Sequence, residues 1–363
     1  MALNQQLTTM KFGILGSGSW GTALAKILTD NGHSIYWWNR NELSIKQIIS
    51  RHHNPQYLST AYFDTSKLKL TTSVEEVIIN SDCIVVAVPS AYIIGILSQL
   101  DKNIFSGKKI LSAIKGILPN NNLLLNDFLR DEFNVELQNY FAVLGPCHAE
   151  EVAAEKLSYL TFSGVDEIVT REIASHFKND YLNTVENNDI YGVQYAAVLK
   201  NIYAVGAGLA HGLDYGDNFL SVLIANSADE MAGFLRKAGV QNIQVGSIEH
   251  LHATTDNRPP ITADTMRTTN YAASVYLGDL LVTCYSLYSR NRTFGNMIGK
   301  GYSVQSAQLE MRMVAEGYNA SKCMYLINEK INAEMPIAET VYRILWQNIP
   351  AAEGFKYIES ELV

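Results

Sequence analysis

The first half of the chain alternates short apolar runs with longer segments whose apolar residues recur at helical spacing. The short runs predict strands and the longer segments predict helices, because one face of a helix returns every three to four residues. Strands are expected at residues 12–15, 34–38, 67–71, 83–88, 109–114, 140–144, 159–162 and 182–185. Helices are expected at residues 42–49, 73–79, 92–100, 122–133 and 167–177, and another follows the first strand and stops at Asn31-Gly32. This alternation predicts a doubly wound α/β sheet.

The second half of the chain has a different pattern. From about residue 190 the apolar spacing is helical almost throughout, and helices are expected at residues 194–210, 218–238, 272–288, 306–314, 321–332 and 338–344. Residues 240–270 are polar and contain Pro259-Pro260, which predicts a loop-rich insertion between helices. We therefore expect two domains, residues 1–190 built on the sheet and residues 191–363 built from helices.

A glycine-rich turn joins the first strand to the helix that follows it. It reads Gly16-Ser17-Gly18-Ser19-Trp20-Gly21, and a second strand comes after the helix. In this order of elements the pattern GxGxxG typically binds a dinucleotide. Gly16 would make the tight turn, Gly18 would let the backbone approach a pyrophosphate, and Gly21 would let the helix pack closely on the strand. The alternative is a glycine turn that serves the fold alone.

The residues after the second strand bear on the choice of cofactor. A site selective for NAD usually places Asp or Glu there to bind the ribose 2′-hydroxyl. This chain has Asn39-Arg40-Asn41 instead. A guanidinium at Arg40 would pair with a 2′-phosphate, which favours NADPH while leaving NADH possible. An arginine that is simply solvated at the strand end is the other interpretation.

Composition and charge narrow the class of protein. The chain has 363 residues, of which 47% are hydrophobic and 18% charged, and its net charge is −8. These values are ordinary for a globular protein with a large core, and the acidic balance argues against general binding of nucleic acid. A locally basic pocket for an anionic substrate stays compatible with that balance.

Cysteine spacing and the hydropathy of the chain bear on its compartment. The cysteines are Cys83, Cys147, Cys284 and Cys323, and they form no CxxC pair. We expect reduced thiols in a cytoplasm-like compartment, without a disulfide framework or a metal site. The N-terminus lacks the pattern of a signal peptide. The longest apolar region, residues 195–213, contains polar and charged residues and predicts a buried helix instead of a membrane span.

Three predicted strands end in residues that carry chemistry. They are followed by Val88-Pro89-Ser90, by Ala113-Ile114-Lys115-Gly116, and by a segment that runs from Gly145 to Glu150. In doubly wound sheets the substrate meets the cofactor beyond these carboxyl ends. Lys115 is therefore a candidate, although a lysine after a strand is commonly a surface residue.

Lys200 lies inside a very apolar predicted helix. Burial disfavours the charged form of an amine and lowers its pKa, which suits proton exchange with a substrate oxygen near neutral pH. A lysine that extends its amine to solvent at the edge of the helix is the alternative.

Two further segments lie within and directly after the predicted helix at 272–288. Asp279 is an acid in apolar company and is placed to orient a lysine or a hydroxyl. Ser289, Arg290 and Asn291 are three consecutive donors, a pattern that favours a phosphate-binding group with Arg as the bidentate element. A solvated turn is the alternative for this second segment.

Together, these motifs resemble the bacterial NAD(P)-dependent glycerol-3-phosphate dehydrogenases. The resemblance runs through most of the chain, in order, over GSGSWGTALA, AIKG, GPCHAEEV, LKNIYAVGAG, LGDLLVTC, SRNRTFG and MVAEG. It implies a Rossmann-like N-terminal domain, an all-helical C-terminal domain of the kind found in 6-phosphogluconate dehydrogenase, and a cytoplasmic homodimer. The implied reaction is hydride transfer between a nicotinamide and C2 of dihydroxyacetone phosphate or sn-glycerol 3-phosphate, which supplies the glycerol backbone of phospholipids.

The resemblance also implies roles for individual residues. Lys200 would exchange the proton, and Asp279 would orient its amine or bind a substrate hydroxyl. The implied substrate-binding residues are Lys115, Gly145, Cys147, Lys200, Asp279, Ser289, Arg290 and Asn291. The implied cofactor-binding residues are Gly16, Gly18, Ser19, Trp20, Gly21, Arg40, Lys115, Ala149, Arg290, Val314 and Glu316, and no metal is implied. This chain departs from the family in having Cys147 where serine is frequent, and a thiol is a weaker donor than a hydroxyl.

Two other classes of function compete with this interpretation. A ketopantoate reductase or a hydroxy-acid dehydrogenase of similar build would need a carboxylate site in place of a phosphate site. A nucleotide-sensing module without catalysis would be expected to lose Lys200 or Asp279, and the chain has both.

Overall fold

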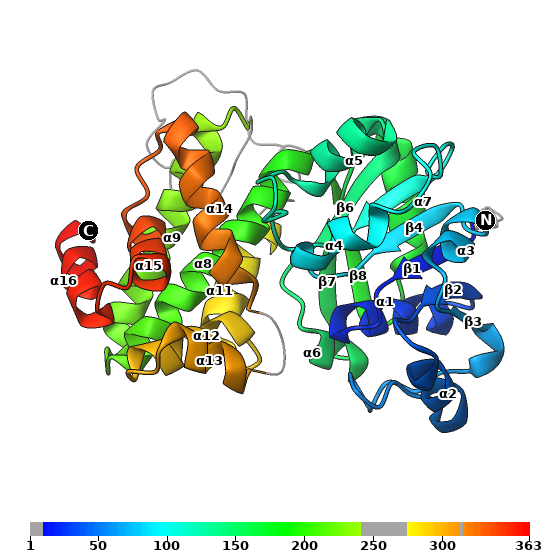
Figure 1. Cartoon of the computed structure of the whole chain (residues 1–363), viewed down its shortest axis with the longest axis horizontal. Coiled ribbons are helices and arrows are strands. Elements are labelled where there is room, and N and C mark those ends of the chain that lie inside the picture. The colour runs from blue at the N-terminus through cyan, green and yellow to red at the C-terminus, as the bar shows by residue number, and fades with distance from the viewer. Residues whose placement is uncertain (1–9, 241–273, 312–314) are drawn as a thin grey trace, which may run out of the picture.

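The computed structural model consists of a lobe built on a β-sheet beside a lobe built from helices (Figure 1). It describes residues 10–240, 274–311 and 315–363. The predicted insertion at 240–270 therefore lies, except for Val240, outside the described residues, as does Val314. Among the described residues, no helix combines the length and hydropathy needed to cross a membrane.

Within the described residues, eight strands form one sheet in the order β3-β2-β1-β4-β5-β6-β7-β8. The strands are β1 (Phe12–Leu15), β2 (Ile35–Trp38), β3 (Leu68–Thr71), β4 (Cys83–Val86), β5 (Lys109–Ser112), β6 (Tyr140–Leu144), β7 (Ser158–Ser163) and β8 (Leu182–Asn187). Strands β1 to β6 are mutually parallel, β7 is antiparallel to β6, and β8 is parallel to β7. The predicted doubly wound sheet is confirmed, and the reversed pair at its end was not predicted.

Helices cover both faces of the sheet. They are α1 (Ser19–Asp30), α2 (Glu42–Arg51), α3 (Val74–Ile79), α4 (Ser90–Leu97), α5 (Leu125–Phe133), α6 (Ala149–Ala153) and α7 (Glu167–Phe177), with short 3-10 turns at Thr65–Lys67 and Leu137–Asn139. Apolar residues of α1, α6 and α7 share one buried cluster with the sheet, and those of α3, α4 and α5 share another. Two buried faces explain why the parallel strands read as continuous apolar runs.

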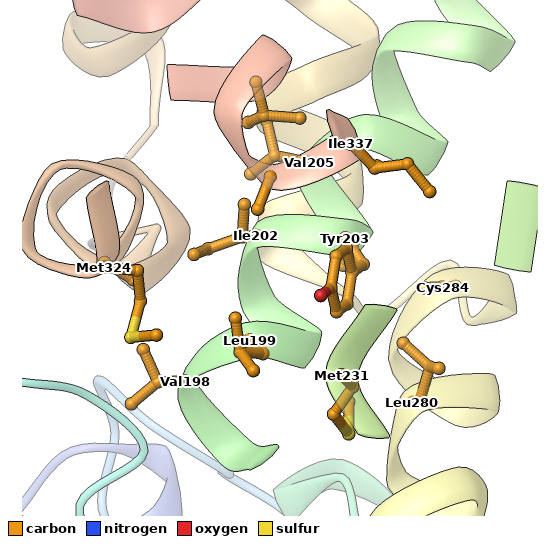
Figure 2. Packing of buried hydrophobic residues seen from close by; sticks show 14 of the residues in the cluster. Val198, Leu199, Ile202, Tyr203, Val205, Met231, Leu280, Cys284, Met324 and Ile337 are labelled. Atoms are coloured by element: carbon orange, nitrogen blue, oxygen red, sulfur yellow. The ribbon is translucent and has the colours of Figure 1, made fainter. Parts of the chain in front are cut away.

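The helical lobe follows the last strand. Its elements are α8 (Ile190–Gly212), α9 (Asp217–Lys237), a π-helix (Ser274–Gly278), α11 (Asp279–Tyr285), α12 (Arg290–Gly299), α13 (Val304–Glu310), α14 (Glu316–Ile331), α15 (Pro336–Trp346) and α16 (Ala351–Glu361). Almost every residue of α8 is buried, since its apolar side chains point in all directions toward surrounding helices. Figure 2 shows Leu199, Ile202 and Tyr203 of α8 between Met231, Leu280 and Met324. The buried helix expected at residues 195–213 is confirmed.

Helices α8 and α12 pack in backbone contact. A Cβ added to Gly208 would lie 2.0 Å from the carbonyl oxygen of Arg292, and one added to Gly295 would lie 2.0 Å from that of Val205. Gly212 and Gly299 make similarly close approaches one turn further along. Glycine at these positions therefore sets the distance between the two helices.

Several predicted elements needed correction. Helix α12 was not predicted, because its two glycines weaken the helical signal while serving the packing just described. Helix α16 was also not predicted. The helix expected at 272–288 ends at Tyr285, where Ser286 turns the backbone to an extended conformation. The helix expected at 306–314 begins earlier and ends at Glu310, and α14 begins at Glu316, five residues before its predicted start.

Candidate active site

A cleft lies where the carboxyl ends of β1, β4, β5 and β6 meet the helical lobe. The described residues that line it are Gly18, Ser19, Trp20, Ala87, Val88, Pro89, Ala113, Ile114, Lys115, Cys147, His148, Ala149, Glu150, Lys200, Asn201, Asp279, Val282, Thr283, Tyr288, Ser289, Arg290, Asn291 and Glu316. The three strand ends singled out from the sequence are thus brought together. Lys200, Asp279 and Ser289 reach the same cleft from the other lobe.

The glycine turn forms the sheet side of the cleft. Gly16 has a φ of +125°, a conformation that favours glycine, and a Cβ there would lie 2.6 Å from the carbonyl of Ala87. A Cβ on Gly21 would lie 2.2 Å from the carbonyl of Gly16, so this glycine does let α1 pack against the strand. A Cβ on Gly18 would meet nothing within 4 Å. The backbone at Gly18 is therefore open to a ligand at the N-terminus of α1.

Lys200 and Asp279 form a buried ion pair inside the cleft. The Lys200 Nζ donates a hydrogen bond to the Asp279 Oδ1, and the two side chains are 3% and 2% exposed. Burial lowers the pKa of Lys200 to about 8, and Asp279 opposes this while Lys115 adds to it. The amine is therefore poised to exchange a proton near neutral pH. The alternative of an amine extended into solvent is wrong.

Asp279 is held by its own helix and has one oxygen to spare. The Thr283 Oγ1 donates to the Asp279 main-chain carbonyl at 2.6 Å, at the first turn of α11. The other carboxylate oxygen, Oδ2, is buried and has no hydrogen-bond partner among the described residues. A buried carboxylate oxygen without a partner is costly, so it indicates a place for a ligand hydroxyl.

Lys115 brings a second amine to the cleft. Its Nζ lies 5.1 Å from the ring centroid of Trp20, in a cation–π contact, and 3.5 Å from the carbonyl of Gly145. Lys115 thereby connects the glycine turn with the end of β6. Two lysines near one aspartate make this part of the cleft locally positive, as an anionic substrate would require.

Two buried asparagines tie the lobes together beneath the lysines. The Asn201 Nδ2 donates to the carbonyl of Lys115 at 2.8 Å, and the Asn291 Nδ2 donates to the Asn201 Oδ1 at 2.9 Å. The Asn291 Oδ1 in turn accepts from the amide of Gly317 at 2.9 Å. Asn291, which the sequence suggested as a substrate ligand, thus uses its oxygen within the protein and retains one Nδ2 hydrogen for other contacts.

Glu316 also crosses between the lobes. It is the first residue of α14, and its carboxylate accepts from the Ser90 Oγ at 2.7 Å and from the Ser90 amide at 3.2 Å. Ser90 opens α4, whose N-cap residue Pro89 offers no side-chain acceptor. The carboxylate therefore caps α4 and lies near the positive ends of two helices.

Cys147 and His148 follow the end of β6 and also line the cleft. The Cys147 thiol donates to the carbonyl of Tyr159 at 3.1 Å, and burial raises its pKa to about 11, so the group stays a thiol at neutral pH. Burial and the charges of Lys115 and Lys200 lower the pKa of His148, which keeps the imidazole neutral. All four cysteines are buried and none forms a disulfide.

Ser289, Arg290 and Asn291 open a helix instead of forming a turn. The Ser289 hydroxyl accepts from the amide of Arg292 and caps α12, and Arg290 is the first helical residue. Ser289 and Asn291 are buried while Arg290 is exposed at the cleft. A cap, a guanidinium and a helix N-terminus at one point suit a phosphate group.

The structure does not bring every candidate to the wall of the cleft. Gly16, Gly21 and Gly145 act through backbone geometry behind it, and Gly145 has a φ of +140°. Arg40 is exposed beyond the end of β2, next to Asn41, which caps α2. Val314 lies outside the described residues.

Comparison with known proteins settles the family. A family model described as the N-terminus of NAD-dependent glycerol-3-phosphate dehydrogenase matches residues 11–169, and another described as its C-terminus matches residues 189–356. The chain belongs to this family.

Relatives and a solved structure agree over the full length of the chain. The glycerol-3-phosphate dehydrogenase [NAD(P)+] of Staphylococcus haemolyticus is 32% identical over 347 residues, which span 95% of this chain and 96% of that protein. The corresponding protein of Enterococcus faecalis is 31% identical over 352 residues, or 96% of this chain and 95% of that one. The crystal structure of the Coxiella burnetii glycerol-3-phosphate dehydrogenase aligns with a TM-score of 0.82 at 24% identity, over 96% of this chain and 98% of that one, and shows a common fold.

Sequence reasoning missed some residues of the dehydrogenase cleft. Asn201 follows Lys200 directly, and a second polar residue in so apolar a helix was the available signal. Thr283 lies inside α11, four residues after Asp279, and nothing in the sequence separates it from an ordinary helical threonine. Ser90 was named only as part of a strand end, and its contact with Glu316 was not predicted.

Proposed function

We propose that the protein is an NAD(P)-dependent glycerol-3-phosphate dehydrogenase that reduces dihydroxyacetone phosphate to sn-glycerol 3-phosphate, reversibly. The observation that carries the proposal is the buried Lys200–Asp279 pair, which the helical lobe delivers to a cleft walled by the glycine turn of the sheet lobe. A buried amine with a lowered pKa beside a carboxylate is an arrangement suited to reducing a carbonyl.

The cleft fits a nicotinamide dinucleotide. Gly18 leaves its backbone open, and the N-terminus of α1 favours a pyrophosphate. When bound, the cofactor supplies or accepts the hydride. Its other contacts in this proposal are with Ser19, Trp20, Lys115, Ala149, Arg290, Val314 and Glu316.

The chemistry of proton transfer falls to Lys200. Its ammonium donates a proton to the carbonyl oxygen of the ketone as negative charge develops there, and in the reverse direction the neutral amine accepts that proton. The Asp279 Oδ1 holds the amine in position, and Oδ2, which has no partner within the described parts of the chain, accepts from a substrate hydroxyl. Cys147 and Lys115 complete the wall around the carbonyl, at the end of the sheet.

The phosphate of the substrate binds at the start of α12. Arg290 donates in bidentate fashion, and Ser289 and the remaining Nδ2 hydrogen of Asn291 add further donors. Fixing the phosphate at a distance from the carbonyl aligns the reacting carbon. The phosphate ligands are separate from Asp279, which holds the Lys200 amine.

A direct assay tests the reaction. Loss of absorbance at the nicotinamide band is followed with dihydroxyacetone phosphate, and a 2-oxo acid serves as the competing substrate. We expect reduction of the phosphorylated ketone alone. Faster reduction of the 2-oxo acid would contradict the proposal and favour a hydroxy-acid dehydrogenase.

The same assay compares NADPH with NADH. We propose that Arg40 makes NADPH the preferred cofactor by pairing with its 2′-phosphate. Replacing Arg40 by Ala is expected to weaken the binding of NADPH by about tenfold, since one charge-assisted contact is lost, and to leave the binding of NADH nearly unchanged. Equal loss for both cofactors would argue against this role.

The biological setting follows from the same proposal. The product would supply the glycerol backbone of phospholipids, and the protein would act in the cytoplasm as a homodimer. Sedimentation of the purified protein tests the dimer.

A further inference from the structure

Two buried side chains behind the glycine turn donate hydrogen bonds to its carbonyl oxygens. The Trp37 Nε1 donates to the carbonyl of Gly16 at 2.9 Å, and the Asn54 Nδ2 donates to the carbonyl of Ser17 at 2.9 Å. Trp37 is fully buried on β2, and Asn54 is 3% exposed in the segment after α2. Neither belongs to the described residues that line the cleft, so both act on it only through the turn.

The amide of Asn54 is held in one orientation. Its Oδ1 accepts from the amide of Gln56 at 3.2 Å, and its Nδ2 also donates to the Thr22 Oγ1 at 3.0 Å. Each hydrogen of the Nδ2 group therefore has an acceptor. Asn54 thus links the segment after α2 to both the turn and the first turns of α1.

The next carbonyl of the turn also points into the protein. The carbonyl of Gly18 accepts from the amide of Thr22 at 2.9 Å, as the first bond of α1. Three successive carbonyls, those of Gly16, Ser17 and Gly18, are thus directed away from the cleft.

The direction of each carbonyl in the turn also fixes the direction of the N–H group that follows it. In a trans peptide the C=O of one residue and the N–H of the next point in opposite directions, and the described chain contains no cis peptide bond. With the carbonyls of Gly16 and Ser17 held on the protein side, the N–H groups of Ser17 and Gly18 face the other side. That side is the open one, where a Cβ on Gly18 would meet nothing within 4 Å.

We propose that Trp37 and Asn54 are positioning residues for cofactor binding: by holding the carbonyls of Gly16 and Ser17 they present the backbone N–H groups of the turn to the pyrophosphate. Without these donors the two peptides are able to rotate, and a carbonyl oxygen would then face the phosphate and repel it. The inference rests on the dinucleotide assignment of the proposed function and adds the residues that set the geometry of the turn.

The experiment replaces each donor by a residue that has no side-chain N–H. Trp37→Phe and Asn54→Ala are compared with Trp38→Phe, a matched control one residue further along β2 whose Nε1 donates to the carbonyl of Thr72 at 3.1 Å, away from the turn. Cofactor affinity is measured by fluorescence titration without ketone, and steady-state constants are measured separately. Amide hydrogen exchange of residues 16–22 is recorded in the protein without cofactor.

We expect the dissociation constant for NADPH to rise about fivefold in Trp37→Phe and in Asn54→Ala, since each loses one hydrogen bond to a carbonyl of the turn. The kcat at saturating cofactor and the KM for the ketone should change less than twofold, and exchange at the turn should speed up. Trp38→Phe should behave as the unaltered protein. Unchanged affinity and unchanged exchange in both variants would overturn the proposal.

A second substitution separates positioning from loss of packing. Trp37 also packs on the Phe63 ring at 5.4 Å between centroids, and the smaller Phe ring reduces this contact. Replacing Trp37 by 3-benzothienylalanine exchanges the indole N–H for sulfur and keeps the shape. Weak cofactor binding in Trp37→Phe that this analogue restores to normal would assign the effect to packing and refute the role of the N–H.

If the unaltered protein binds neither cofactor, the proposed function itself fails; if it binds and all variants bind equally, only the positioning role fails.

Discussion

Each lobe of the molecule contains a buried lysine, and the two lysines behave in opposite ways. Lys26 on α1 is 6% exposed and Lys200 on α8 is 2% exposed. Burial lowers the pKa of both, but hydrogen bonds and charge attraction from Asp30 and Glu155 more than offset it at Lys26, whose pKa is raised. At Lys200 the attraction of Asp279 does not offset burial, and the pKa falls to about 8.

The partners explain the difference. Lys26 lies 2.6 Å from Asp30 and 3.0 Å from Glu155, and these carboxylates are 32% and 60% exposed, so water still solvates the cluster. Asp279 is 2% exposed, and Lys115 places a second positive charge nearby. Burial of a lysine therefore does not by itself indicate catalysis: the balance of charge around it and the access of water to its partner decide whether the amine holds its proton or exchanges it.

Replacing Lys200 by Ala should have the largest effect. Removing the proton donor is expected to lower kcat/KM for ketone reduction by roughly 10³- to 10⁴-fold, while cofactor binding largely survives. Reduction is measured at the nicotinamide band and cofactor binding by fluorescence titration. Full activity in this variant would defeat the assignment of Lys200.

The pH dependence of the reaction sharpens the comparison. Reduction needs the ammonium form of Lys200, so kcat/KM for the ketone should be level below about pH 8 and fall about tenfold per unit above it. Oxidation of the alcohol needs the neutral amine and should rise with pH to a plateau above the same value. In Asp279→Asn the amine loses the attraction that supports its charge, so any residual activity should show its break at lower pH. An unmoved break would exclude Asp279 as the group that tunes Lys200.

Replacing Lys26 by Met is the matched control in the sheet lobe. This change should leave kcat and KM within about twofold, because Lys26, near the C-terminal end of α1, is not among the described residues that line the cleft and keeps its proton in the whole working range. It should lower the free energy of unfolding by about 1 kcal/mol, the upper end of what an ion pair with solvated carboxylates contributes. Urea unfolding measures the loss. A fall in kcat as large as that of Lys200→Ala would erase the distinction between the two lysines.

Replacing Cys147 by Ser should have the smallest effect. The thiol already donates to the carbonyl of Tyr159, and a hydroxyl is a better donor at the same place. The KM for dihydroxyacetone phosphate is expected to change by about threefold or less, with kcat unchanged. A larger change would show that the substrate distinguishes sulfur from oxygen at this wall.

The sequence could predict features made by neighbouring residues better than contacts between residues far apart in the chain. The glycine turn is contiguous, so Gly16 and Gly21 could be given their geometric roles from spacing alone, and the structure agrees. The Lys200–Asp279 pair joins residues far apart in sequence. The only sign in the sequence that they contact each other was the apolar surroundings of each residue. The roles of Asn201 and Ser90 were not predicted, because they come from partners, Lys115 and Glu316, that only folding brings near.

Helix α12 is an element that local sequence propensity could not predict. No helix was predicted after Arg290 because Gly295 and Gly299 are poor helix formers in isolation. Their helical state is stabilised by contact with α8, a tertiary effect that local propensity does not contain.

The glycine contacts between α8 and α12 have a consequence for substrate choice. Since the two backbones touch, the Lys200 amine on one helix and the start of the other at Arg290 belong to a single stiff body, and relative movement of the lobes would not alter their separation. A substrate must therefore span a fixed interval between its carbonyl and its phosphate. Ketose phosphates with additional carbons in that interval should be reduced poorly, and bulkier residues at Gly208 or Gly295 should shift the accepted length before they abolish activity.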